Sequence, residues 1–395
     1  MSDTLTATLR VASPSAARGA NRTFVDIGEV PLAQWRELFA RAIEPNAFYH
    51  PAWARAASEH AREAAHAKAL LAYDPDDPAR LIGLMPVVSS WQALGLPLPL
   101  LVSWQPYTRL TTPLIDRTRA HVAAAGLIDA ARAAGARALL HIDYSCEGAA
   151  AMVVRDVLAK RGLAPRMLRR RERACLDATQ DADALLHEAL GAKKLKELRR
   201  QRHRLEDLGE VKFEVATAPA DVARGLDQFL ALEASGWKGM RGTALAGDMG
   251  DLAFIRAATQ ALAQEGCCEI VTLTAAGKAV AAGIVLRHDT RAYFFKIAYD
   301  EELAKSSPGV QLTLDLTRRF CADGAIADVD STANAYHPMI DKIWRERLAV
   351  ATAIVPLRAN AFVGPMQFLV NARERVRRDL RRFYHRLLDS RETPR

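Results

Sequence analysis

Hydrophobic and polar positions recur along the chain with two different periods, and the period distinguishes helices from strands. The first half begins with a strand and two helices, the first of which starts at a proline. Three extended segments follow, and then a helix that ends at Gly135, a strand, a helix that ends at Gly162 and a last strand. We expect these elements, in order, at 22–28, 31–43, 50–66, 67–73, 80–90, 110–116, 119–135, 136–144, 148–162 and 167–178.

The second half has a similar order with clearer periodicity. A long helix that ends at Gly209 leads into a strand and two helices. Three strands joined by the short turns AG and DT predict an antiparallel sheet, and a helix, a strand, a short helix and a strand complete the order β-α-α-β-β-β-α-β-α-β. We expect these elements at 182–208, 211–217, 221–237, 251–266, 268–275, 278–288, 291–300, 309–322, 325–330, 337–346 and 349–357, with a last basic helix at 365–388.

Length and composition indicate a globular protein with two domains. The chain has 395 residues, more than one compact core usually holds, and 50% of them are hydrophobic while 25% are charged. That balance excludes global disorder, and 22 Gly with 18 Pro exclude a collagen-like chain. We expect a flexible tail at 1–22, a degenerate domain at 23–180, a second domain at 181–360 and a basic helix at 361–395.

The cysteines and the first residues favour a reducing compartment. Five cysteines without a CxxC pair support neither a disulfide framework nor a structural zinc site, so no metal is expected. The first ten residues contain no apolar stretch typical of a secretory signal. We therefore expect a cytoplasmic protein.

One uncharged stretch raises the question of a membrane-spanning helix. No charged residue occurs from Leu81 to Thr108, a length that would cross a bilayer. The prolines within it break helical hydrogen bonding, which a bilayer cannot replace with water. Two strands joined by an apolar loop fit the stretch better, and the loop at 91–104 could contact a membrane or an acyl chain.

Positive charge is concentrated in three stretches. The net charge is +8, but residues 161–173 carry six Arg against one Glu, and residues 193–204 carry seven Lys or Arg against one Glu. The third stretch, 371–395, carries nine Arg against four acidic residues. Such patches indicate anionic partners, among which we do not expect nucleic acid. The basic helices are either solvated faces or contacts with an anionic membrane surface.

Motifs in the second half resemble a known family. LEASGWKGMRGTAL (232–245), FFKIAYDEELAKSSPGVQL (294–312) and the opening LGAKKLKELRRQRHRLEDLGEVKFEVA (190–216) are similar to GNAT-superfamily acyltransferases of bacterial exopolysaccharide and cellulose biosynthesis. Those proteins are related to the Fem-type peptidyltransferases. The resemblance covers roughly residues 185–350 and implies an α/β fold with mixed sheets, built from two tandem GNAT-like folds. It also implies acyltransferase activity with acyl-CoA as the donor.

The resemblance places the donor beside one strand and one helix N-terminus. In the GNAT fold, a bulge in the strand at 291–300 donates a hydrogen bond to the thioester carbonyl, and the next helix holds the diphosphate at its N-terminus. Only Gly309 stands where the family usually has several glycines, so an ordinary turn before a helix is the alternative. The implied cofactor-binding residues are Lys296, Ser307, Gly309, Val310 and Gln311.

A polar cluster after the strand at 325–330 contains candidate catalytic residues. His337 titrates near neutrality, which suits a general base, although it could instead cap the short helix that follows. Asp330 ends that strand, and Glu233 is expected on one helix face with Trp237. The predicted catalytic residues are His337, Asp330 and Glu233, and the predicted substrate-binding residues are Trp237, Lys238, Tyr299 and Tyr336.

These observations favour an enzyme that moves an acyl group from acyl-CoA to an amine or hydroxyl of an envelope precursor. The acceptor would be a sugar, an amino lipid or a long-chain amine. The enzyme would be cytoplasmic, either free or peripherally bound to the inner membrane. One alternative is an aminoacyl-tRNA-dependent, Fem-like peptidyltransferase, although the predicted elements include no long antiparallel helical arm. Another is a non-catalytic GNAT-fold module for an anionic polymer or lipid, which the single glycine of the phosphate loop leaves open.

Overall fold

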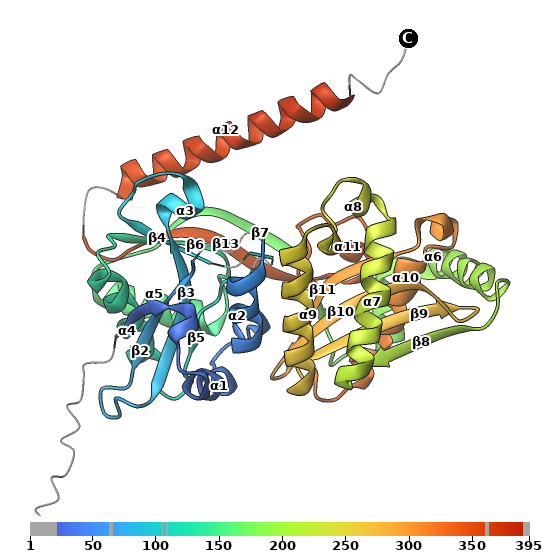
Figure 1. Ribbon diagram of the computed structural model, residues 1–395, viewed down its shortest axis with the longest axis horizontal. Coiled ribbons are helices and arrows are strands. Elements are labelled where there is room, and N and C mark those ends of the chain that lie inside the picture. Colours follow the sequence, from blue (N-terminus) through green and yellow to red (C-terminus); the bar gives the residue numbers. More distant parts are fainter. Residues whose placement is uncertain (1–21, 63–65, 105, 108–109, 360–362, 390–395) are drawn as a thin grey trace, which may run out of the picture.

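The computed structural model describes residues 22–62, 66–104, 106–107, 110–359 and 363–389. Of the tail expected at 1–22, only Arg22 lies within these ranges. The described chain forms one mixed sheet of 13 strands that runs through two lobes (Figure 1). The strands are β1 (Phe24–Asp26), β2 (Lys68–Tyr73), β3 (Leu81–Ser89), β4 (Leu100–Ser103), β5 (Leu114–Ile115), β6 (Ala138–Ser145), β7 (Arg166–Asp177), β8 (Val211–Ala216), β9 (Cys268–Ala275), β10 (Lys278–His288), β11 (Arg291–Tyr299), β12 (Asp328–Asp330) and β13 (Glu346–Pro356).

Helices cover both faces of the sheet. They are α1 (Leu32–Ala40), α2 (Pro51–His60), α3 (Ser90–Leu94), α4 (Ala120–Ala133), α5 (Ala149–Lys160), α6 (Ala182–Glu206), α7 (Pro219–Ser235), α8 (Trp237–Met240), α9 (Met249–Gln264), α10 (Pro308–Ala322), α11 (Ile340–Ile343) and α12 (Val363–Asp389), with 3-10 turns η1 (Ile27–Glu29), η2 (Ala47–Tyr49), η3 (Leu245–Gly247) and η4 (Glu301–Ser306). In the second lobe α7 and α9 pack on one face, and α6 and α10 pack on the other. Successive strand residues such as Ile270 and Val271 therefore enter different cores, as the pleat requires.

The strand order is symmetric about its centre. It runs β1-β2-β3-β4-β6-β13-β7-β12-β11-β10-β9-β8, with β5 paired to β3. Each lobe contains an antiparallel run that leads into one parallel pair, β4 with β6 and β11 with β12. The two halves exchange their last strands. Strand β13, from the second half, pairs with β6 of the first half, and β7, from the first half, pairs with β12 of the second half. The repeated order confirms the tandem fold. The divisions expected at residues 180 and 360 stay predictions, since each lobe contains a strand from the other half.

One hydrophobic core joins the two lobes. Trp53 of α2 packs edge-on against Phe295 of β11, with 4.9 Å between ring centroids. His288 of β10 accepts a hydrogen bond from the Asn46 N–H at 2.8 Å and stacks on Phe39 at 3.6 Å. Helices from the first half thus form one wall of the core in the second lobe, and this packing holds the candidate site against both halves of the chain.

Most predicted elements are present, and several local features differ from expectation, three of which have a clear cause in the backbone. The helix expected at 221–237 ends earlier, because Gly236 adopts extended backbone with φ −88° and ψ −173°. The long helix α6 is broken at Gly191, where φ is 72° and ψ is 161°. The short helix α3 was not expected, and a capping box between Ser89 and Gln92 starts it. Each difference arises at one or two residues that leave the hydrophobic period unchanged.

No helix among the described residues has the length and apolar content needed to span a membrane. The described part of the uncharged stretch instead forms β3, α3 and β4. Strands β3 and β4 pair antiparallel, from Val87 opposite Ser103 to Ser89 opposite Leu101. This arrangement agrees with the expectation of paired strands in place of a spanning helix, but β4 lies within the stretch 91–104 that was expected to be a loop.

Candidate active site

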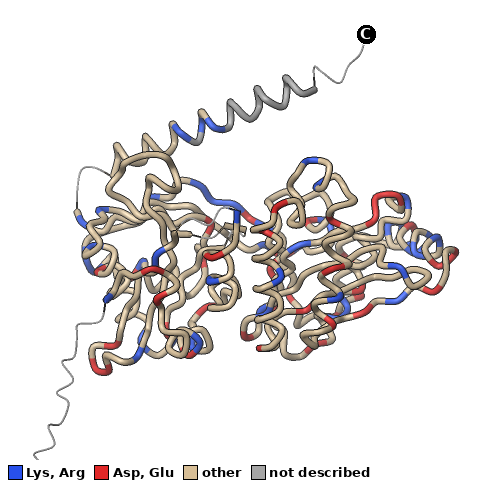
Figure 2. The backbone as a smooth tube through the Cα atoms, viewed as in Figure 1, with Lys and Arg blue, Asp and Glu red and all other residues tan. Residues whose placement is uncertain are grey.

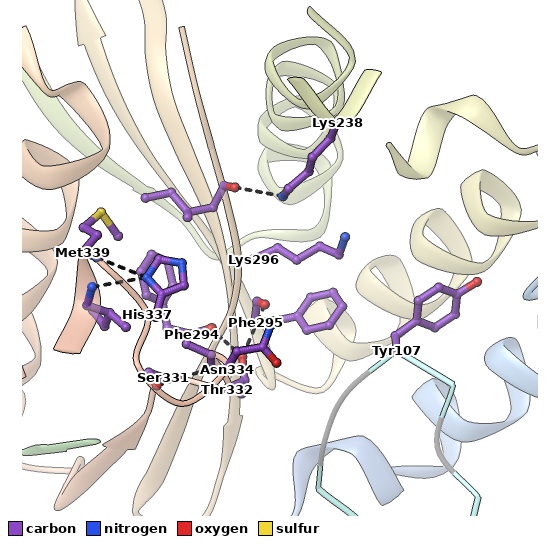
Figure 3. Close-up of a pocket in the computed structure, with 13 residues that line it drawn as sticks. Tyr107, Lys238, Phe294, Phe295, Lys296, Ser331, Thr332, Asn334, His337 and Met339 are labelled. Carbon is purple, nitrogen blue, oxygen red and sulfur yellow. Dashed lines mark hydrogen bonds between the residues drawn. The ribbon is translucent and has the colours of Figure 1, made fainter. Parts of the chain in front are cut away.

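A pocket of about 290 Å³ opens in the second lobe where β11 and β12 separate (Figure 3). The two strands pair in parallel only over 291–293 and 328–330. Beyond this point β11 continues to Tyr299, whereas the chain turns away after β12. Residues 294–297 line one side of the pocket and residues 331–334 line the other. Two parallel strands that separate leave main-chain groups without ladder partners, so a ligand can bind between them.

Strand β11 carries a β-bulge at this pocket. Its register against β10 shifts between Ile284, opposite Lys296, and Val285, opposite Phe294. Phe295 therefore has no partner in β10, at the position where β12 has already left the other edge. A bulge turns the main chain out of the ladder, and the carbonyls of this segment accept hydrogen bonds from the side chains of Thr332 and Lys238, so its N–H groups are the ones that a ligand would contact.

Thr332 lines the pocket at the turn that follows β12. Its hydroxyl donates a hydrogen bond to the Phe294 carbonyl at 2.8 Å. Its φ of 50° is in the left-handed region, which is uncommon for a β-branched residue. The chain therefore reverses sharply after β12, and this reversal separates the two strands. Such backbone is often found at functional sites.

Two lysines and a buried glutamate form a charged cluster beside the pocket. Glu233, near the end of α7, accepts hydrogen bonds from Lys238 Nζ at 3.0 Å and Lys296 Nζ at 3.2 Å. Burial alone would raise the pKa of Glu233, but the two lysines hold that pKa below its usual value. Burial in turn lowers the pKa of Lys296. The cluster has one net positive charge, and its carboxylate is a weak base.

The helix face expected to carry both Glu233 and Trp237 does not exist, because α7 ends between them. Trp237 begins α8 and is exposed, whereas Glu233 is buried. Trp237 lines a small hollow beside the pocket together with Tyr299 and Lys238. Tyr336 is almost fully exposed and is not among the pocket-lining residues. Three of the predicted substrate-binding residues therefore lie together, namely Trp237, Lys238 and Tyr299, whereas Tyr336 lies apart from them.

Asp330 lies beneath the pocket. Its buried carboxylate pairs with the guanidinium of Arg173, a buried residue of β7, and accepts a hydrogen bond from the Thr332 N–H at 2.8 Å. A strand from the first half of the chain thus contacts the turn that opens the pocket in the second lobe. Because both partners are buried, the contacts of Asp330 fit a residue that positions this turn better than a free base.

His337 lines the pocket and also caps α11 (Figure 3). Its Nδ1 accepts hydrogen bonds from the N–H groups of Met339 at 3.3 Å and Ile340 at 3.4 Å. A ring nitrogen that accepts carries no proton, so we assign the proton of the neutral imidazole to Nε2. Burial lowers the pKa of His337 from 6.5; Asp341 partly offsets this shift, and the nearby Lys238 adds to it. The ring is therefore neutral at pH 7 and offers a hydrogen-bond donor to the pocket.

The N-terminus of α10 is partly covered. The N–H groups of Val310 and Gln311 both donate to the Ser307 carbonyl, at 2.9 and 3.1 Å. The Gln311 side chain is buried and donates to a carbonyl of α6 at 2.8 Å. A Cβ on Gly309 would lie 3.1 Å from the ring of Tyr299. Among the predicted phosphate-binding N–H groups, only that of Gly309 donates to no acceptor in the described part of the chain.

The sequence did not identify several residues of the site, among them Tyr107, Thr332 and Arg173. Tyr107 comes from the first half and lines the pocket. Its hydroxyl donates to Asp251, and its ring stacks on Phe254 at 4.5 Å. Tyr107 and Arg173 reach the site only because the halves pack together, which a single sequence does not show. A β-branched residue in left-handed backbone likewise has no sequence signal.

The corresponding opening in the first lobe is filled by the chain itself. After β4, residues 110–113 run along β6, where the Thr111 N–H donates to the Asp143 carbonyl at 3.2 Å. Thr112 Oγ1 accepts a hydrogen bond from the Ser145 N–H at 3.2 Å. The interpretation of the first half as a degenerate copy stays a prediction. In the described part of the chain, no group of three or more His, Cys, Asp or Glu residues could hold a metal ion.

A mixed sheet that opens between a bulged strand and its parallel neighbour, with a helix connecting the two, is the architecture of GNAT-type acyltransferases. Residues 192–337 match the family model described as an acetyltransferase (GNAT) domain. The chain therefore contains a GNAT domain in its second half, and its fold is that of a GNAT acyltransferase. The match extends from α6 to His337 and includes both strands that form the pocket.

Three solved structures are similar to most of the chain. The C-terminal DUF2156 domain of a protein described as a lysylphosphatidylglycerol synthetase, from Agrobacterium fabrum, has a TM-score of 0.53 at 14% identity and covers 86% of this chain and 96% of its own. FemX has a TM-score of 0.53 at 9% identity, with 83% and 96% covered. A conserved protein of unknown function from Bacteroides thetaiotaomicron has a TM-score of 0.53 at 13% identity, with 84% and 99% covered. These similarities establish the fold of both lobes. No curated protein matches the sequence.

Proposed function

We propose that the protein transfers an acyl group from acyl-CoA to an amine or hydroxyl of an envelope precursor. The observation that carries this proposal is the pocket at the Phe295 bulge, between the separated strands β11 and β12. A thioester laid along β11 would have its carbonyl next to main-chain N–H groups that the ladder does not use. Donors fixed in this way favour the transition state, in which the carbonyl oxygen becomes negatively charged.

The reaction requires one bond to form and one to break. The acceptor nitrogen or oxygen attacks the thioester carbon, a C–N or C–O bond forms, and the C–S bond then breaks. The proton of the acceptor passes, directly or through water, to the departing thiolate, and CoA leaves as its thiol. No metal or redox partner is needed for this balance, and the protein must supply orientation and electrostatic stabilisation.

The charged cluster supports an amine acceptor in particular. Lys238 and Lys296 lie beside the pocket and share the carboxylate of Glu233. Their net positive charge disfavours a second ammonium group nearby, so it lowers the pKa of an incoming amine. An amine attacks only in its neutral form. We infer that the cluster promotes the nucleophilic form of the acceptor, with Glu233 as the residue that positions the two lysines.

We place His337 in contact with the reacting atoms as a hydrogen-bond donor. Its Nε2–H is the donor that the capping contacts leave for the pocket. In this role it stabilises the oxyanion, whereas the general-base role would require a proton-free Nε2. Asp330 acts through the turn at Thr332 and is a positioning residue in this proposal.

The CoA diphosphate would bind at the open edge of the α10 N-terminus, at the Gly309 N–H. A helix N-terminus favours negative charge through its free N–H groups and its dipole. Arg204 of α6 lies next to this place, because its guanidinium donates to the Lys305 carbonyl at 3.3 Å. Trp237 and Tyr299 provide ring surfaces beside the pocket that suit the sugar ring or alkyl chain of the acceptor.

Calorimetric titration with acetyl-CoA tests the donor site. Ala333 lines the pocket, and Ala333→Phe would fill part of it. We expect this variant to weaken acetyl-CoA binding by at least about tenfold, because the side chain occupies the space of the thioester. Ala79→Phe is the matched control, since Ala79 is exposed in a turn of the first lobe and should leave binding unchanged. Equal binding by both variants would place the donor elsewhere.

The other functional classes predict different outcomes of the same titration. A Fem-like enzyme would not bind acetyl-CoA. It would bind an aminoacyl-tRNA, which would contact the basic helix α6. A non-catalytic module would bind an anionic polymer or lipid and release no CoA from acyl-CoA with any amine. Release of free CoA thiol in the presence of a long-chain amine, but not in its absence, would support the proposed transfer.

A further inference from the structure

Helix α12 is anchored to the first lobe at its beginning. Val363, Met366 and Val370 are buried in the core that joins the lobes. Arg373 donates to the carbonyls of Leu94 at 2.6 Å and Ala93 at 3.3 Å, at the end of α3. The helix then continues away from the body of the protein (Figure 1). These contacts account for one face of α12 and only for its first turns.

A second apolar face of α12 is exposed. Leu369 and Val376 are seven residues apart and therefore lie on one side of the helix, offset from the buried side. Phe368 borders this face and is 72% exposed. Trp91, on the contacting helix α3, is 65% exposed. Large aromatic and aliphatic side chains are rarely left in water on neighbouring elements unless the surface binds something.

The charges of the same helix indicate what this surface binds. Arg375 and Arg377 are exposed, and Figure 2 shows basic residues along the described part of the helix. The stretch 371–395 carries nine Arg against four acidic residues. A helix with an apolar face, bordering aromatic residues and basic flanks lies in the interface of an anionic bilayer, where apolar side chains enter the acyl region and arginines meet phosphates.

We propose that the exposed face of α12, together with Trp91 of α3, docks the protein on a membrane that contains anionic phospholipid. The net positive charge of the helix supports this occupant over a second copy of the chain, since two such helices would repel each other. The inference concerns where the protein works and does not depend on acyl transfer. Membrane binding can be measured without turnover, so the two proposals fail separately.

Vesicle co-sedimentation of the full chain tests the proposal. We expect the protein to sediment with vesicles of phosphatidylglycerol and phosphatidylcholine at low salt, and to remain in solution with phosphatidylcholine alone or at high salt. The triple variant Phe368→Ser/Leu369→Ser/Val376→Ser should abolish binding. The variant Arg375→Glu/Arg377→Glu should weaken it by about tenfold or more, because each arginine near the surface contributes attraction.

Two controls keep the result interpretable. Met152→Ser changes an exposed apolar residue on α5 and should bind vesicles like the unchanged protein. Circular dichroism should show the same melting temperature for all variants, because the altered side chains are exposed. Unchanged sedimentation of the triple variant would overturn the proposal. So would a dimer in light scattering that forms without lipid and is lost in the triple variant, since the face would then bind a second copy.

Discussion

His337 combines a structural and a chemical contact in one side chain, and the two can be separated. Asparagine at this position would keep an acceptor for the N–H groups of Met339 and Ile340 but would remove the imidazole. We expect His337→Asn to lower kcat by roughly 10²-fold with an unchanged melting temperature. His337→Ala should lower kcat similarly and also destabilise the protein by about 1 kcal/mol, because the cap is lost.

The pH dependence of kcat provides the second readout for His337. Burial lowers the pKa of this histidine from 6.5, so protonation occurs only below that pH. A protonated ring cannot accept at Nδ1 and cap α11, so with a hydroxyl acceptor, which does not titrate in this range, activity should be full above pH 6.5 and fall on the acid side. This acid limb should be absent from His337→Asn. An identical limb in the variant would assign the titration to another group and remove His337 from the reaction.

The buried ion pair beneath the pocket gives a prediction about stability. Arg173→Met would leave the carboxylate of Asp330 buried without its cation. Removing one partner of a buried pair costs about 3–5 kcal/mol, because the remaining charge is uncompensated. The double variant Arg173→Met/Asp330→Asn should recover much of this loss, since no charge remains. Urea unfolding measures both effects, and equal stability of the single and double variants would contradict the account.

At the scale of residues, the sequence predicts which residues belong to the site better than it predicts the residues that they contact. Lys238, Lys296 and His337 do line one pocket, because the family resemblance and the strand period together place them near the opening. The sequence predicts Glu233 and Asp330 as catalytic residues, but it does not predict their contacts with lysine and arginine. An ion pair forms between segments distant in sequence, and the hydrophobic period contains no information about it.

Helix α6 shows how one residue can contradict a regular pattern. The sequence predicts a continuous helix, and in such a helix Gly191→Ala would be stabilising by about 1 kcal/mol. The structure breaks the helix there, with φ 72° and ψ 161°, a conformation almost restricted to glycine. We therefore expect Gly191→Ala to destabilise the protein by about 1–3 kcal/mol. Gly324→Ala is the control, because no atom lies within 4 Å of the added Cβ, and it should be nearly neutral in thermal unfolding.

At the scale of elements, most helices and strands were predictable because each depends on a local period. The elements that were missed or misplaced depend on single conformations: α3 on a capping box, and the end of α7 on extended backbone at Gly236. The bulge in β11 was expected only through the family resemblance. Its position at Phe295 depends on the register with β10, which is a property of the pair of strands.

The strand exchange has consequences for the whole molecule. Residues 181–395 include the GNAT domain but lack β7, which pairs with both β12 and β13. We expect this fragment alone to be unfolded or aggregated, because two strands of its sheet would have open edges. Co-expression with residues 1–180 should restore a complex that elutes as one species in gel filtration. A folded, monomeric fragment 181–395 would show that β7 is dispensable.

The exchange could not be predicted from the sequence, although the repeat of element order could. A strand that joins its own half and a strand that crosses to the other half have the same period and the same apolar content. Only the packing of complete lobes decides between these two pairings. The same holds for the core between the lobes, where Trp53 and Phe295 meet across a large separation in sequence.

Buried histidines, among them His141 and His288, make the stability of the whole molecule depend on pH between 6.5 and 4. Burial lowers the pKa of His141 and of His288 from 6.5 to about 4, and both rings bond to main-chain groups, His288 across the lobes. As the pH falls, these histidines are therefore protonated at a higher pH in the unfolded chain than in the folded protein. The stabilisation is complete above pH 6.5 and is lost as the pH falls towards 4.

Each histidine should therefore contribute a slope of roughly 1.4 kcal/mol per pH unit to the free energy of unfolding between pH 6.5 and 4. Urea unfolding across this range measures the slope. His288→Gln retains an acceptor for the Asn46 N–H but does not titrate, so it should lower the slope by roughly 1.4 kcal/mol per pH unit whatever its effect at pH 7. A variant slope equal to that of the unchanged protein would mean that the histidine between the lobes is not held neutral by folding.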